Sequence, residues 1–122
     1  MRSISTATAG AAALTLLSSA ALAHHGWAGN TEAFELTGTV AAPVDLSGPH
    51  GTMQVRDADG KVWDITLAPA ARSARAGLSE DTLAVGAQVT VSGMRNDNPE
   101  RLEIKTRRVT HDGTNYDVYP PE

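Results

Sequence analysis

Short runs of residues in which apolar and polar side chains alternate are the feature that most restricts the fold of this chain. In the first run, which begins at Glu32, Phe34, Leu36 and Val40 share one face. Further runs lie at about residues 52–56, 61–67, 88–93 and 102–109, with a shorter one at 116–118. Period-two alternation is typical of strands in an antiparallel sheet that buries one face. The chain is therefore predicted to be mainly β.

Turn signals and one alanine-rich segment separate these runs. The sequence Asp57-Ala58-Asp59-Gly60 predicts a hairpin, with Gly60 in the left-handed position. Gly38 predicts a bulge or bend inside the first strand, and the pair Arg107-Arg108 predicts a bulge in the fifth. Residues 43–49 are expected to form a loop. Residues 68–77 are expected to contain one short helix, because Pro69 suits a first helical turn.

The order of these elements favours one small architecture. Three strands, a short helix and two or three further strands are the element order of the OB-fold, a small barrel. Closure into a barrel also removes the exposed edges of so small a sheet. We therefore predict an all-β fold with one short helix: an antiparallel OB-like barrel of five to six strands over residues 32–119, with a tail at 120–122. The predicted core comprises Phe34, Leu36, Val40, Val55, Trp63, Ile65, Val89, Val91 and Ile104.

The first 23 residues have the layout of a secretory signal peptide. Arg2 is followed by an apolar run from Ala7 to Leu22 and by the small residues of Ala21-Leu22-Ala23. The apolar run is too short and too rich in alanine for a membrane span. We expect residues 1–23 to be removed, residues 24–31 to begin the mature protein as an arm, and the product to be periplasmic.

Composition narrows the classes of partner. The chain has no cysteine, so an exported domain of this size must fold without disulfides, and zinc–thiolate sites are excluded. Its formal net charge is −4 and becomes more negative once Arg2 is removed. An acidic balance argues against nucleic acid and against anionic lipid surfaces as partners. None of these features indicates an oligomeric state.

A set of motifs spread over the mature chain resembles one known family. The motifs are His24-His25-Gly26-Trp27, Leu36-Thr37-Gly38-Thr39-Val40, Pro49-His50, Asp59-Gly60 before Trp63, and the spaced series Leu83, Gly86, Val89, Val91 and Gly93. The set is similar to small exported proteins catalogued as domain of unknown function 6152. Members of that family typically open His-His-Ser-Phe and carry Asn-Pro-His, whereas Gly26-Trp27 and Gly48 stand at those places here. The resemblance implies an OB-like barrel in the periplasm and supplies no activity.

The residues at the predicted cleavage site suggest a metal function. Cleavage after Ala23 would free the α-amine of His24 beside two imidazoles, those of His24 and His25. Nitrogen donors of this kind suit copper. The amine and ring of His24, with a third imidazole from His50, would form a histidine brace. Alternatively, His25 at position two would bind Cu(II) through the amine, a deprotonated amide and its ring. We therefore expect an exported copper-binding protein with His24, His25 and His50 as ligands.

Each of these residues also has a plainer interpretation. The histidine pair is also compatible with a flexible leader of no consequence, and His50 with a ring that bonds to loop backbone. His111, in a His-Asp-Gly turn, is expected to be solvated. Met53 and Trp63 offer a thioether and an aromatic face to Cu(I), although core packing is the stronger expectation for both. The competing class of function is a periplasmic interaction or small-ligand-binding module without metal, with a protein partner.

No enzyme class is indicated. The serines lack a nucleophile motif and the chain has no glycine-rich phosphate loop. Arg72 and Arg75, with Arg107-Arg108, could form a modest anion-binding patch. In an acidic chain we expect these arginines to balance neighbouring carboxylates instead.

Overall fold

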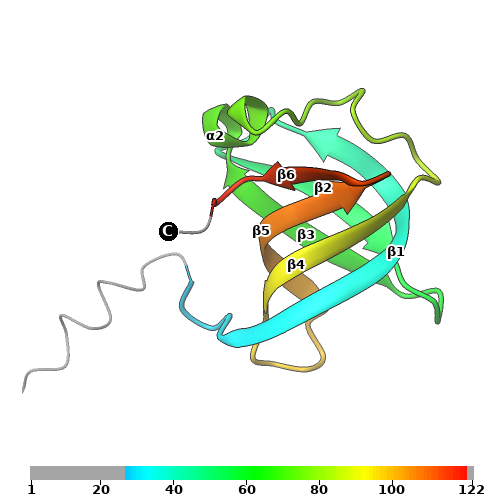
Figure 1. Ribbon diagram of the computed structural model, residues 1–122. Coiled ribbons are helices and arrows are strands. Elements are labelled where there is room, and N and C mark those ends of the chain that lie inside the picture. Colours follow the sequence, from blue (N-terminus) through cyan, green and yellow to red (C-terminus); the bar gives the residue numbers. More distant parts are fainter. Residues whose placement is uncertain (1–26, 121–122) are drawn as a thin grey trace, which may run out of the picture.

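The computed structural model describes residues 27–120 as a small β-barrel (Figure 1). Its elements are β1 (Glu32–Asp45), β2 (His50–Arg56), β3 (Val62–Pro69), α2 (Ala70–Arg75), β4 (Gln88–Arg95), β5 (Glu103–His111) and β6 (Thr114–Asp117). The predicted all-β fold with one short helix is thereby confirmed. The predicted signal peptide and the ligands His24 and His25 lie outside the described residues. Among residues 27–120 no helix has the length and apolar character to cross a membrane.

Five strands close the barrel, and the long first strand makes this closure possible. β1 pairs with β4 over Glu32–Thr39 and then with β2 from Thr39 to Asp45. The sheet order is β3-β2-β1-β4-β5-β6, and an additional pairing of β3 with β5 closes the circle. That closing pair is parallel, whereas every other pair in the sheet is antiparallel. This order agrees with the predicted OB-like barrel, with β6 as an additional strand on β5.

Gly38 lies where β1 passes from one neighbour to the other. A Cβ atom at this position would lie 2.2 Å from the backbone oxygen of Arg56 and 2.9 Å from a side-chain carbon of Val55. Only glycine lets the two strands approach so closely, which is a known use of glycine inside strands. The register of β1 is regular at Gly38, and its shifts lie later, between Val40 and Asp45, so the predicted bulge is not at Gly38; the glycine is needed there for the close approach of β1 and β2.

The predicted bulge at the arginine pair is present, and it shapes the site described below. Ser92 of β4 pairs with Arg108 of β5, whereas the next residue, Gly93, pairs with Thr106. Arg107 is therefore the extra residue of the bulge. Its side chain is exposed, while Thr106 before it is buried in the barrel.

The turn between β2 and β3 follows the local chemistry of its sequence. The backbone N–H of Asp57 donates to the Lys61 carbonyl at 2.8 Å, and Gly60 has a φ of 84°. The Asp57 carboxylate accepts from the indole Nε1 of Trp63 at 3.0 Å and from the backbone N–H groups of Asp59 and Lys61 at 2.9 Å. These bonds, led by the one from Trp63, lower the pKa of Asp57. The predicted hairpin is confirmed.

The core agrees with the alternation apart from one residue and several omissions. Of the nine predicted core residues, eight are buried, and Phe34 is half-buried against the core. Met53, expected to pack in the core, is also buried, and buried residues that were not predicted include Val44, Leu67, Leu78, Leu83, Val109 and Val118. Leu78 and Leu83 come from the segment between α2 and β4, where no periodicity revealed them.

Several strand boundaries differ from prediction, most clearly at the expected loop 43–49. β1 continues through Pro43 to Asp45. The register with β2 shifts between Ala42 and Asp45, so Pro43 has no ladder partner in this stretch. Proline is tolerated in a strand at such irregularities because its missing N–H is not needed there.

Candidate functional site

The closing pair of strands is short, and a pocket lies where it ends. β3 and β5 pair only over Asp64–Thr66 and Glu103–Lys105. Beyond this point β3 runs on to α2, while β5 pairs with β6 from Arg108 to His111. A cavity of about 210 Å³, here called the seam pocket, lies at this divergence. Its lining residues are Trp27, His50, Thr66, Leu67, Lys105, Thr106 and Tyr119.

Residues from the two ends of the described chain cover this pocket. The rings of Trp27 and Tyr119 meet edge to face, with centroids 5.4 Å apart and an interplanar angle of 66°. The carbonyl of Arg107, the bulge residue, accepts from the backbone N–H groups of Val118 and Tyr119. In Figure 1 the segment after β6 and the segment before β1 lie on the same side of the barrel. The bulge in β5 therefore positions the aromatic cover.

The described part of the N-terminal arm is fixed by hydrogen bonds. The backbone N–H of Asn30 donates to the Trp27 carbonyl at 2.9 Å, and that of Asp97 to the Gly29 carbonyl at 2.7 Å. The Asp97 carboxylate accepts from both the backbone N–H and the hydroxyl of Thr31, and these bonds lower the pKa of Asp97. Trp27 thus has a defined place over the pocket.

Arginine side chains pack on both covering rings. The Arg107 guanidinium lies 5.2 Å from the centroid of Trp27, and that of Arg72 lies 5.2 Å from the centroid of Tyr119. Arg108 forms an ion pair with Asp117, which raises the pKa of the arginine. The expectation that the arginines balance neighbouring acids is therefore confirmed for Arg108. It is wrong for Arg72, Arg75 and Arg107, which have no ion-pair partner among residues 27–120.

Of the predicted ligands, only His50 lies in the described structure. It is the first residue of β2, is exposed, and lines the seam pocket. The preceding Pro49 accepts a hydrogen bond from the backbone N–H of Ala70 at 3.3 Å, which ties this loop to the start of α2. The imidazole itself makes no hydrogen bond within residues 27–120, so the plainer interpretation, a ring bonded to loop backbone, is not observed there.

His111 is not among the residues that line the seam pocket. Its Nδ1 lies 2.9 Å from the Gln88 carbonyl oxygen and its Nε2 lies 3.4 Å from a carboxylate oxygen of Asp112. The ring is half-buried, so the expectation of a solvated turn histidine is wrong. In the described part of the chain, no three side chains of His, Cys, Asp or Glu are placed to hold a metal ion together.

Trp63 and Met53 serve the core, as expected from their positions. Trp63 stacks on Phe34 with centroids 5.2 Å apart and an interplanar angle of 16°. The Arg95 guanidinium lies 4.8 Å from the Trp63 centroid and 5.1 Å from that of Phe34. We call Phe34, Trp63, Arg95 and the hydrogen-bonded Asp57 the aromatic stack. The stack lies where the starts of β1 and β3 meet the end of β4. Because the indole N–H of Trp63 already donates to Asp57, Trp63 has no hydrogen-bonding group left for a ligand.

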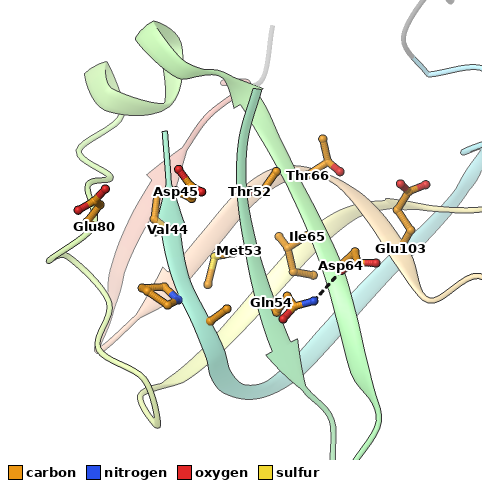
Figure 2. A pocket seen from close by; sticks show the side chains of 12 residues that line it. Val44, Asp45, Thr52, Met53, Gln54, Asp64, Ile65, Thr66, Glu80 and Glu103 are labelled. Carbon is orange, nitrogen blue, oxygen red and sulfur yellow. Dashed lines mark hydrogen bonds between the residues drawn. The ribbon is translucent and has the colours of Figure 1, made fainter. Parts of the chain in front are cut away.

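A larger cavity than the seam pocket is lined mainly by residues of β1, β2 and β3 (Figure 2). It measures about 720 Å³, and its lining includes the carboxylates of Asp45, Asp64, Glu80 and Glu103. Several of its polar groups pair with one another or with near neighbours: Gln54 donates to Asp64 at 2.9 Å, and Ser47 donates to Asp45. The carboxylates are spread along the groove in Figure 2 and do not converge on one point.

A protein-family comparison assigns the chain. Residues 12–104 match the model of a family described as "Family of unknown function (DUF6152)". The chain belongs to this family. The resemblance drawn from the sequence motifs is confirmed. Searches of the curated proteins and of the solved structures give no significant match.

In this DUF6152 member, sequence reasoning found His50 but missed the rest of the seam pocket. Thr66 and Lys105 reach it through the pairing of β3 with β5, for which no local pattern exists. Tyr119 reaches it through its bond to the bulge residue Arg107, a partner that the local pattern does not reveal. Thr106 carried a usable signal, because it is a polar residue at an inward position of an otherwise apolar face. A polar side chain at such a position calls for a partner.

Proposed function

We propose that this protein is exported to the periplasm and binds copper at its mature N-terminus, with His24, His25 and His50 as ligands. The observation that carries the proposal is the shared place of His50 and Trp27 in the lining of the seam pocket. A single residue, Gly26, separates Trp27 from the two N-terminal histidines. The chain therefore reaches the pocket just after the predicted chelating residues.

Covalent geometry supports this assignment. Consecutive Cα atoms are about 3.8 Å apart, so two peptide bonds place His25 within about 8 Å of Trp27, measured between Cα atoms. One further bond brings in His24 and its free α-amine. These distances are covered only by the combined reach of two histidine side chains, so a side chain on this segment and that of His50 could meet at one ion when they extend toward each other.

The donor chemistry also favours copper over harder ions. An α-amine and imidazoles are nitrogen ligands, which copper prefers, whereas magnesium and calcium require oxygen. No carboxylate lines the seam pocket. His111 makes a good reference, because its Nδ1 lies against the Gln88 carbonyl.

One modification and two variants test the proposal. Mass spectrometry of the exported protein first establishes whether His24 is the free terminus, and Cu(II) titration of that form measures affinity. Acetylation of the α-amine of His24 should greatly weaken binding, because both forms of the N-terminal chelate need that amine free. His50→Ala should weaken binding by a smaller factor, and the control His111→Ala should leave it unchanged. Equal affinity in the acetylated protein would refute the site.

The same site predicts a pH dependence. Imidazole and amine nitrogens must lose their protons before they bind a metal. Copper affinity should therefore fall as the pH drops below about 6, near the ordinary range for histidine. A titration series between pH 5 and 8 at constant ionic strength measures this, and affinity that is independent of pH would point to other ligands.

A further inference from the structure

The rings that cover the seam pocket belong to a continuous series of arginine and aromatic side chains. Arg107 lies 5.2 Å from the centroid of Trp27, which in turn lies 5.4 Å from the centroid of Tyr119. Arg72 completes the series at 5.2 Å from Tyr119. We call these four residues the arginine ladder. Both arginines are exposed and have no ion-pair partner among residues 27–120, so the ladder presents two uncompensated positive charges held in place by rings.

The larger cavity of Figure 2 has the opposite charge. Its lining within residues 27–120 includes four carboxylates and no lysine, arginine or histidine; the carboxylates are those of Asp45, Asp64, Glu80 and Glu103. We call this cavity the acidic groove. None of the four carboxylates has an ion-pair partner in the described part of the chain. Hydrogen bonds from Ser47 lower the pKa of Asp45, so that carboxylate is ionised at neutral pH.

The arginine ladder and the acidic groove share a border. Thr66 lines both the acidic groove and the seam pocket that the ladder covers. It pairs with Lys105 across the closing strands, and two residues earlier Asp64 pairs with Glu103. In Figure 2, Thr66 lies toward the end of the groove that Glu103 marks, and Glu80 lies at the opposite end. Unneutralised charges of opposite sign therefore occupy neighbouring surfaces of one barrel.

Neighbouring surfaces of opposite charge are complementary to a second copy of the same molecule. When a two-fold axis passes through their border, the ladder of each copy faces the groove of the other, and the two contacts form together. Such an interface closes on itself and does not extend into a filament. The groove, at about 720 Å³, has room for side chains of the facing copy. Tryptophan, tyrosine and arginine, the residue types of the ladder, are also those enriched in the energetic centres of protein interfaces.

We propose that the protein forms a two-fold symmetric dimer in which the arginine ladder of each copy binds the acidic groove of the other. Arg72 and Arg107 pair with groove carboxylates, which a guanidinium contacts through two parallel hydrogen bonds. A second copy fits better than a separate partner, because one chain supplies both charged surfaces and neutralises neither. The association requires no metal, so it does not depend on the proposed copper site.

The first experiment measures the mass of the exported protein by sedimentation equilibrium after metal has been removed with a chelator. We expect a dimer at low ionic strength. We expect a monomer in about 1 M sodium chloride, where the screening length is about 3 Å. A monomer at low ionic strength and protein concentrations up to the millimolar range would overturn the proposal. A dimer that is insensitive to salt would overturn it as well, because opposite charges would not hold that dimer together.

Two double variants locate the interface. The ladder variant, Arg72→Glu with Arg107→Glu, and the groove variant, Asp64→Arg with Glu80→Arg, change exposed side chains only. Each places like charges opposite one another and should weaken dimerisation about tenfold or more. As a control, Arg56→Glu with Lys61→Glu makes the same change of net charge as the ladder variant at exposed residues that line neither cavity. Equal weakening in this control would show a diffuse charge effect and refute the interface.

A mixture of the two double variants gives the decisive test. The ladder variant carries an acidic ladder and an acidic groove, whereas the groove variant carries a basic ladder and a basic groove. Both contacts are therefore repulsive within each variant and attractive between the two. We expect the equimolar mixture to recover the dimer mass that each variant alone has lost. Because only folded partners can recover it, the result also excludes unfolding as the cause of the loss. A mixture that stays monomeric would refute the proposed pairing.

Discussion

Two aromatic clusters flanked by arginine differ in how their polar groups are satisfied. In the aromatic stack, Trp63 donates its indole N–H to Asp57, and Arg95 lies over the rings of Trp63 and Phe34. In the seam pocket the rings meet edge to face over a cavity, and the buried Thr106 hydroxyl has no partner in the described structure. The first cluster is complete as a structural element. The second leaves a cavity beneath its rings, so the comparison separates a cluster that is closed and fully bonded from one that encloses free space.

Removing the central ring of the aromatic stack should have the largest effect. Trp63→Ala takes a buried ring out of the core and should cost about 3–5 kcal/mol of the free energy of unfolding. Urea denaturation of the purified domain measures this loss. A loss below about 1 kcal/mol would mean that the stack does not stabilise the barrel, and the contrast with the seam pocket would disappear.

Removing a covering ring of the seam pocket should cost less, because Trp27 is only half-buried. A double-mutant cycle of Trp27→Ala and Tyr119→Ala should give a coupling free energy of about 0.5–1.5 kcal/mol, as is usual for aromatic pairs. As a control, Trp27→Ala combined with Phe34→Ala should be additive. A coupling of zero for the first pair would show that the two ends of the described chain do not depend on each other.

The flanking arginines sharpen the comparison further. Arg95→Gln should cost about 0.5–1 kcal/mol, because its guanidinium lies over two rings and also donates to the Pro99 carbonyl. Arg107→Gln should cost less, since Arg107 is exposed and lies over Trp27 alone. Thermal denaturation of the two variants side by side tests this order, and the reverse order would contradict it.

The smallest effect expected is a pH dependence from Asp57. Hydrogen bonds lower its folded-state pKa, so the stabilisation it provides is present above its ordinary, unfolded pKa and is lost as the pH falls through the lower folded value. The thermal midpoint should therefore decrease once the pH is lowered below about 4. Asp57→Asn should be less stable at neutral pH and show a flatter fall in acid. Asp59→Asn, in the same turn, should keep the wild-type slope; a wild-type slope in Asp57→Asn would contradict the assignment.

The parts of the fold that sequence could predict are those set by neighbours in the chain. Alternation located the strands, Asp57 and Gly60 located a turn, and Arg107 located a bulge, because each depends on a few adjacent residues. The extension of β1 through Pro43 was missed because the register with β2 decides it. Leu78 and Leu83 were missed because their burial follows from barrel closure and not from a local period.

The candidate site was less accessible to the sequence for the same physical reason. His50 stood out by its chemistry and its proline neighbour. Lys105 and Tyr119 have no such signal, since they become pocket residues only when β3 and β5 pair and then separate. Thr106 lies at an inward position of β5, but whether its hydroxyl finds a partner is a property of the assembled barrel.

The contact between Trp27 and Tyr119 has a consequence for the order of folding. Almost the whole described chain separates these two residues, so their contact closes the longest loop in the barrel and carries a high entropic cost. Contacts of such separation tend to form late and open first. Hydrogen exchange should therefore show that the backbone amides of Val118 and Tyr119 are less protected than those of the β1–β4 ladder. The seam pocket would then be the last part of the protein to assemble and the most sensitive indicator of an incomplete chain.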